Sequence, residues 1–166
     1  VVLGSIISIV FIAYTVKKIN EEHMVEQSIK SGENIVDQYK KIRGYYTKKV
    51  VVPVKKNKAM KINFDHANKL DTIPLPATMI HDLSKIISSG ESGLQLKLYS
   101  SYPFPNRASR ELDSFGKDAL NNFETKGNTG TFARAETLNN KEVVRVAIAD
   151  YMVAQGCVNC HNSRAD

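Results

Sequence analysis

Cysteine is scarce in this sequence, with two residues among 166. Both lie near the C-terminal end, as Cys157 and Cys160. A disulfide framework needs several separated cysteines, so this chain lacks the cross-links that hold small secreted domains together. A disulfide between two such close residues would close a very short loop and stabilise little. A structural zinc site is also disfavoured, because a second Cys or His pair at suitable spacing is missing.

Signatures of catalysis and of nucleic-acid binding are missing as well. The sequence contains no phosphate-binding loop and no nucleophile and base at paired spacing, so we expect no enzymatic activity within it. The formal net charge is +6. Lys and Arg are spread along the chain and form no known nucleic-acid motif, so we expect a solvated basic surface and no nucleic-acid partner. The length suits one ordinary domain.

Charge is absent from residues 1–16, VVLGSIISIVFIAYTV, which precede Lys17 and Lys18. As a helix this run would span roughly 24 Å, short of the roughly 30 Å of a hydrocarbon core. Because the chain begins with Val, we interpret residues 1–16 as part of a transmembrane anchor that has lost its upstream end. A cleaved signal peptide would fit the length, but no small-x-small site follows. A buried helix is disfavoured because every face is apolar.

Residues 17–52 are expected to form one long membrane-proximal helix. Its apolar stripe advances in alternating steps of four and three residues. Such a helix can pair with its twin in a homodimer or lie against its own domain. Pro53 is expected to end or kink it, and the polar residues 55–73 are expected to form a loop. The stripe consists of Val25, Ile29, Gly32, Val36, Tyr39, Arg43, Tyr46 and Val50.

The remaining residues, 53–166, predict a domain of the α+β class with a small antiparallel sheet. Prolines 74 and 76 introduce a helix over about 76–88, with a core stripe of Met79, Ile80, Leu83, Ile86 and Ile87. The alternating residues 94–99, LQLKLY, predict a strand, and SYPFPNR predicts an ordered irregular loop. A further helix begins at about Asp113, with Leu112, Phe115, Ala119, Leu120 and Phe123 on one face. Strands at about 130–137 and 142–149 should meet in a tight hairpin at Asn139 and Asn140.

Residues 157–161, Cys-Val-Asn-Cys-His, match the C-x-x-C-H pattern of c-type haem attachment. Two thiols at this spacing can bond both vinyl groups of one porphyrin, and the adjoining imidazole then binds the iron. We therefore assign Cys157 and Cys160 as attachment residues and His161 as the proximal iron ligand, on a loop at the chain end. A thioredoxin-like redox pair remains an alternative, although it does not require the His.

Covalent haem of this type is made on the outer side of the bacterial plasma membrane. The motif therefore predicts a bacterial inner-membrane protein whose domain faces the periplasm. This interpretation outweighs the positive flank at Lys17 and Lys18, which would favour a cytoplasmic side.

The sixth iron position is open among several residues. We expect His23 to be solvated, His66 to be a bare surface residue, and His81 to be a partly exposed residue beside the stripe of its helix. Tyr39, Tyr45 and Tyr46 could approach the haem, although aromatic packing is commoner. An open position favours gas binding, whereas two strong ligands favour redox sensing or electron transfer. Four methionines are also available in principle: Met24, Met60, Met79 and Met152.

Four stretches in this order resemble the single-haem c-type sensor domains in the periplasmic parts of bacterial signal transducers. They are GYYTKKVV, IPLPATMIHDLS, LYSSYPFPNR with a following LDSF, and VRVAIADYMVAQGCVNCHNS. The resemblance covers about residues 35–163 and implies a PAS-like fold with a long N-terminal helix. It implies one covalent haem c on Cys157 and Cys160, with His161 as axial ligand. Within the matched stretch His81 is the first candidate for the distal side, and His66 is the second.

The family also suggests what this chain lacks. Some relatives use a cysteine as the second iron ligand, and the absence of a third Cys excludes that here. Members are commonly fused to kinase, cyclase or chemotaxis output modules and usually continue into further strands, so we expect the chain to be truncated at its C-terminal end.

These observations together predict an extracytoplasmic haem c sensor module of a membrane-bound signal transducer. It would respond to redox state or to a small gaseous ligand. One alternative is a membrane-anchored monohaem cytochrome c that transfers electrons to a redox partner. Another is a binding module with a structural haem, whose PAS-like pocket binds a small molecule.

Overall fold

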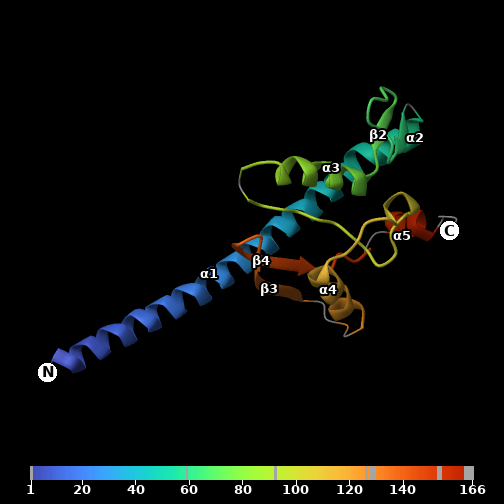
Figure 1. Ribbon diagram of the computed structural model, residues 1–166. Coiled ribbons are helices and arrows are strands. Elements are labelled where there is room, and N and C mark those ends of the chain that lie inside the picture. The colour runs from blue at the N-terminus through green and yellow to red at the C-terminus, as the bar shows by residue number, and fades with distance from the viewer. Residues whose placement is uncertain are drawn as a thin grey trace. The chain divides into compact units, whose positions relative to one another are not determined.

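The computed structural model describes residues 2–58, 60–91, 93–125, 127, 130–152 and 155–162 (Figure 1). The architecture is α+β, with a long N-terminal helix and two small two-stranded sheets. The chain divides into two compact units. Unit 1 consists of Val1–Asn34 with Arg110–Asp166, and unit 2 consists of Ile35–Ser109.

The long helix is continuous in its α-helical form from Val2 to Tyr46 (α1, 45 residues). A π-helical turn, η1 (Thr47–Val51), and a short helix, α2 (Val52–Asn57), follow directly. The helical run therefore continues past Pro53, and the expectation that Pro53 ends the helix is wrong. The alternative, a kink at Pro53, stays a prediction, and the π-helical turn η1 directly precedes α2, whose first turn contains Pro53.

The predicted stripe of the long helix is less exposed than the rest of the helix surface. All eight of its residues, seven on α1 and Val50 on η1, are partly buried, and pairing with a twin stays a prediction. In unit 1, Gly32 lies against Val146, and the Thr131 hydroxyl donates to the carboxylate of Glu33. In unit 2, the Tyr46 hydroxyl donates to the carbonyl of Pro74 at 2.8 Å.

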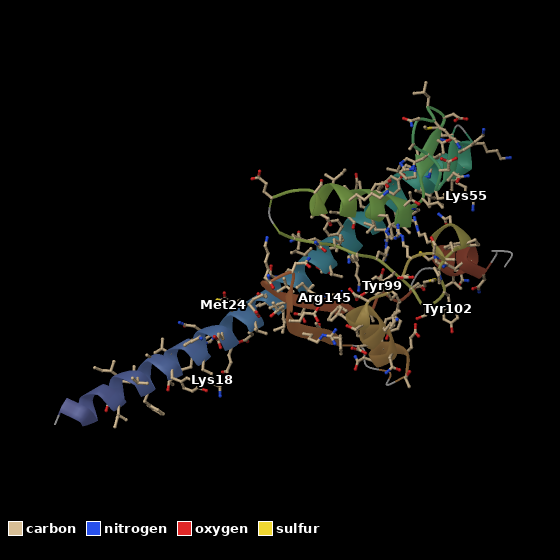
Figure 2. All side chains as sticks on the ribbon, in the orientation of Figure 1. Lys18, Met24, Lys55, Tyr99, Tyr102 and Arg145 are labelled. Atoms are coloured by element: carbon tan, nitrogen blue, oxygen red, sulfur yellow. The ribbon has the colours of Figure 1, made fainter. Side chains whose placement is uncertain are left out.

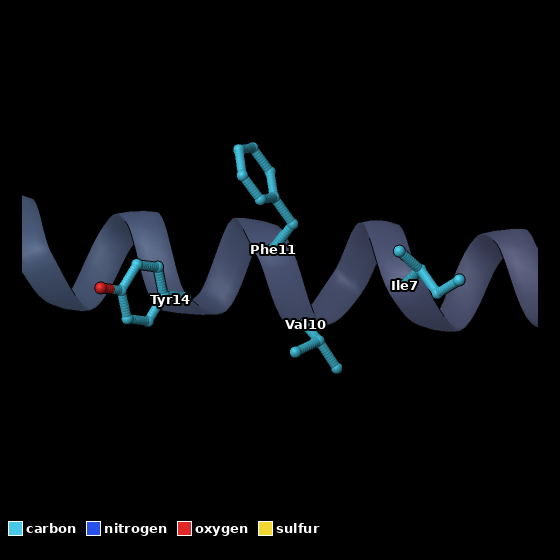
Figure 3. Close-up of a pocket in the computed structure, with 4 residues that line it drawn as sticks. All are labelled: Ile7, Val10, Phe11 and Tyr14. Carbon is cyan, nitrogen blue, oxygen red and sulfur yellow. The ribbon is translucent and has the colours of Figure 1, made fainter.

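Residues 7–14 of α1 are exposed on every face of the helix. Figure 3 shows four of its side chains, which line a shallow apolar hollow on the helix: Ile7, Val10, Phe11 and Tyr14. Each is at least 60% exposed. Among the residues that the structure describes, no helix has the length and apolar content needed to cross a membrane. The anchor at residues 1–16 stays a prediction.

Unit 2 contains the helix α3 (Pro76–Ser88), which confirms the predicted bounds. Ile80 is buried as predicted, but Ile86 is 68% exposed, so the predicted stripe is wrong at that position. The segment 55–73 is not all loop, because β1 (Lys61–Asn63) pairs in parallel with β2 (Thr72–Pro74). The parallel pair was not predicted.

The predicted strand at 94–99 is not formed, because residues 93–100 have no regular secondary structure. The alternation is still visible in burial: Leu94, Leu96 and Leu98 are partly buried, while Gln95 and Lys97 are exposed. The Leu96 carbonyl accepts from the hydroxyl of Ser84 on α3. A side-chain hydrogen bond thus attaches this segment to α3. A strand would instead be held by backbone hydrogen bonds to a neighbouring strand.

Unit 1 contains the helix α4 (Ser114–Glu124) and the antiparallel strands β3 (Thr131–Leu138) and β4 (Lys141–Ile148). The Asp113 carboxylate caps α4 by accepting from the backbone N–H of Gly116 at 2.9 Å. The predicted hairpin is confirmed, with φ of 52° at Asn139 and 60° at Asn140. Two successive left-handed residues suit the tight turns that match strand twist.

A charged network fastens α4 to the hairpin. Arg134 and Arg145 are directly opposite each other on β3 and β4, which would be unfavourable for like charges alone. Glu136 lies between them and accepts from Arg134 Nε at 3.1 Å and from an Arg145 terminal nitrogen at 3.0 Å. Both guanidinium groups also lie over the ring of the buried Phe115, at 5.2 Å and 4.2 Å from its centroid.

Aspartates complete this network, so each arginine has more than one carboxylate partner. Arg134 donates to Asp118, and Arg145 donates to Asp113. Burial acts to lower the pKa of Arg145, but the hydrogen bonds and charges of Asp113 and Glu136 outweigh it and raise that pKa.

The close approach of α1 to β4 predicts that Gly32 tolerates no larger side chain. A Cβ at Gly32 would lie 3.0 Å from Val146 Cβ and Cγ2, whereas a Cβ at Gly44 would meet nothing within 4 Å. We expect Gly32→Leu to lower the free energy of unfolding by about 1–3 kcal/mol through overpacking. The matched control Gly44→Leu should leave stability unchanged or raise it, since Leu is the better helix former. Urea unfolding of the two variants measures this, and equal effects would contradict the assigned contact.

Candidate functional site

The C-x-x-C-H residues lie on a helix, α5 (Gln155–Asn162), so the expectation of a loop is wrong. Residues three and four positions apart share one face of a helix. The helical backbone therefore places Cys160 and His161 on the same face as Cys157. The local sequence permits this, because only Val158 within the motif is β-branched. A hydrogen bond from Gln155 Nε2 to Asn159 Oδ1, 2.7 Å long, links successive turns.

The side chains of the motif differ in accessibility. Cys157 is a free, exposed thiol, and His161 is partly buried. The side chain of Cys160 lies outside the described residues. Within the described part of the chain, no group of three or more His, Cys, Asp or Glu side chains could hold a metal ion by itself. Among the described side chains of α5, Cys157 and His161 supply one exposed thiol and one imidazole about one helical turn apart.

His81 is buried on α3, with 8% of its surface exposed, so the expectation of a partly exposed residue is wrong. Thr78 precedes it by three positions on the same helix face and is 5% exposed. Leu75 and Pro76 start the helix at a position that turns this polar pair inward. Sequence periodicity placed His81 beside the apolar stripe and gave no sign of its burial.

Arg107 is a residue of this region that the sequence analysis missed. It lies in a 3-10 turn, Pro105–Arg107, at the end of the predicted irregular loop. Its terminal nitrogen donates to the Thr78 hydroxyl at 3.1 Å. The loop is therefore held to α3 by a charged donor and a buried acceptor. The only signal in the sequence was the pair of prolines that stiffens the loop.

His66 is not a bare surface residue, because its Nε2 lies 3.3 Å from Asp82 Oδ2. Its Nδ1 lies 3.4 Å from the carbonyl oxygen of Phe64. One ring nitrogen thus lies near a carboxylate oxygen and the other near a backbone carbonyl oxygen. This pair links the segment between β1 and β2 to α3. Asp82, its partner on α3, directly follows His81 in the sequence.

The other candidates for the sixth position are less enclosed. His23 has a side chain that is 68% exposed, which confirms a solvated residue. Met24, Tyr45 and Met152 are also exposed. Tyr46 is occupied by its bond to Pro74, and burial raises the pKa of its hydroxyl. Met60, Met79 and Tyr39 are partly buried.

A protein-family model matches most of the chain. The family model described as Tll0287-like matches residues 21–166, which is all but the first 20 residues of the chain. No curated protein and no solved structure matches it.

The Arg107–Thr78 contact predicts that Thr78→Val loosens the irregular loop. Valine keeps the shape of the side chain but cannot accept from the guanidinium, and hydrogen bonds to charged groups contribute about 1.5–3 kcal/mol. We expect faster backbone hydrogen exchange over residues 101–108, measured by mass spectrometry. Thr125→Val, at a solvent-exposed hydroxyl, is the control. Unchanged exchange in the loop of Thr78→Val would show that other contacts hold it.

Proposed function

Because the chain belongs to the Tll0287-like family, we propose that it is a c-type haem sensor domain. The haem would be attached through Cys157 and Cys160, with His161 as the proximal iron ligand. The observation that carries this proposal is the C-x-x-C-H motif on one face of α5, with the thiol of Cys157 exposed for bond formation.

The residues of α5 suit this role in a second respect. An isolated helix of eight residues is marginal in water, because too few hydrogen bonds offset the cost of its first turn. Covalent attachment at Cys157 and Cys160 would tie two successive turns of α5 to one rigid ring and so supply stability that the short helix lacks. When bound, the haem supplies a redox-active iron that can take small ligands.

The sensing role extends the family assignment. We propose a PAS-like module, tethered by residues 1–16 to the bacterial inner membrane and facing the periplasm. Its response to redox state or to a gaseous ligand would pass along α1 toward the anchor, and any enzymatic output would lie outside residues 1–166. The uninterrupted helix from Val2 to Tyr46 supports this route, since a rigid element can carry a shift over many turns.

For the distal side of the haem we propose His81. Its support is its burial: the imidazole is 8% exposed within its own unit, on the face of α3 that it shares with the buried Thr78. His66 is the second candidate, because its side chain is more exposed, at 25%.

Covalent haem attachment is tested on protein expressed with periplasmic haem maturation. We expect the wild-type chain to retain haem on a denaturing gel. Cys157→Ala with Cys160→Ala should lose it, because no thioether can form. His23→Ala, at an exposed histidine of α1, is the control and should retain haem. A wild-type chain without covalent haem would overturn the proposal.

The distal assignment is tested by visible spectra of the oxidised, reduced and carbon-monoxide-treated protein. With His81 as a ligand, His81→Ala should convert six-coordinate iron to five-coordinate iron and admit carbon monoxide, whereas His66→Ala should not. If the wild-type iron already binds carbon monoxide, gas sensing is favoured. If it stays six-coordinate in every variant, another residue is the ligand, and simple electron transfer gains support.

A further inference from the structure

The basic residues of unit 2 are concentrated in one stretch of the chain. Between Asp37 and Asp65 the sequence has nine Lys and Arg residues and no acidic residue. Lys and Arg do occur along the whole chain, as expected, but in this stretch no acidic residue accompanies them. This stretch comprises the end of α1, all of η1 and α2, and the strand β1.

The part from Tyr45 to Lys58, here called the basic segment, has lysines without acidic partners. All five of its lysines are exposed, and within the described part of the chain none forms an ion pair. The acidic residues on either side are already engaged: Asp37 lies 2.7 Å from Lys41, and Asp71 lies 3.3 Å from Lys61. Asp65 pairs with Lys69. The unpaired lysines are Lys48, Lys49, Lys55, Lys56 and Lys58.

Exposed apolar side chains occur among these lysines. Tyr45 is 67% exposed and Val52 is 43% exposed. Lys48 and Lys49 lie between them in sequence, about one helical turn from each. Figure 2 shows Lys55, the next lysine, extending from the side of α2. An aromatic residue and an aliphatic residue flanked by charged side chains match the composition of protein interfaces, where Tyr is enriched and the rim is polar.

Helix electrostatics do not account for this concentration. Lys55 and Lys56 lie in the last turn of α2, where a positive charge is favourable to the helix dipole. Lys48 and Lys49 lie in η1, which continues directly into α2, so no free helix end favours their charges. The helix dipole therefore does not explain these two lysines, whereas an acidic partner would pair with them.

A protein partner fits the basic segment better than a lipid surface. Helices that lie on membranes bury a broad apolar face. In the basic segment Val50, Val51 and Val54 are partly buried by the chain itself, which leaves Val52 as the exposed aliphatic residue. We propose that the basic segment is a docking surface for a protein with an acidic surface. Lysine, a mobile point charge, suits electrostatic steering of such a partner.

The test uses the full chain, loaded with haem, in nonionic detergent, and a fluorescein-labelled polyglutamate peptide as the probe. The variant K48E/K49E/K55E/K56E reverses four charges of the basic segment. The matched control K85E/K97E/K117E/K141E reverses four exposed lysines elsewhere and changes the net charge equally. We expect fluorescence anisotropy to show peptide binding that weakens with salt. Affinity should fall at least about tenfold in the segment variant and much less in the control.

The other outcomes overturn the proposal. Equal weakening in the two variants would show that only net charge matters. Absence of peptide binding, with segment-dependent binding to phosphatidylglycerol over phosphatidylcholine vesicles, would assign the segment to lipid. Helical circular dichroism confirms that both variants are folded. The result does not depend on haem attachment, because Cys157, Cys160 and His161 are unchanged in both variants.

Discussion

The structure depends on the packing of one helix face. Within each unit, the part of α1 that belongs to that unit packs against its other residues, and the kind of contact differs between the units. In unit 1 the absence of a side chain at Gly32 lets the helix backbone approach Val146. In unit 2 the contact is polar, between the Tyr46 hydroxyl and the Pro74 carbonyl. The helix residue that makes the contact, Gly32 in unit 1 and Tyr46 in unit 2, belongs in each case to the predicted stripe.

Sequence reasoning succeeded where local chemistry decides the backbone. Asn139 and Asn140 tolerate positive φ, and Asp113 caps α4, so the hairpin and that helix follow from a few residues. Sequence reasoning failed where a residue far away in the sequence determines the local structure. The segment 94–99 has the alternation of a strand, yet a hydrogen bond from Ser84 to Leu96 ties it to α3. Alternation fixes which side chains point inward and leaves the ladder partner unspecified.

The candidate site shows the same division. Cys157, Cys160 and His161 were recognisable because the chemistry of attachment fixes their spacing. That they lie on a helix was missed, since eight residues are too few for a period to be visible. His81 is buried although its neighbours in sequence gave no sign of it. Arg107 bonds Thr78, which lies 29 positions earlier in the chain. No pattern in a single sequence encodes such a contact.

The positively charged residues of this chain fall into two groups that differ in burial: the partly buried arginines of the hairpin and the exposed lysines of the basic segment. Arg134 and Arg145 are partly buried. Each pairs with carboxylates and lies over the ring of Phe115, and these contacts hold α4 to the hairpin. The lysines of the basic segment are exposed, without carboxylate partners in the described residues, and stay available to an approaching surface. A planar guanidinium suits the first role, because its N–H donors have fixed directions that match a carboxylate held in place. A flexible ammonium suits the second, because it can adjust to a partner whose geometry the chain does not fix.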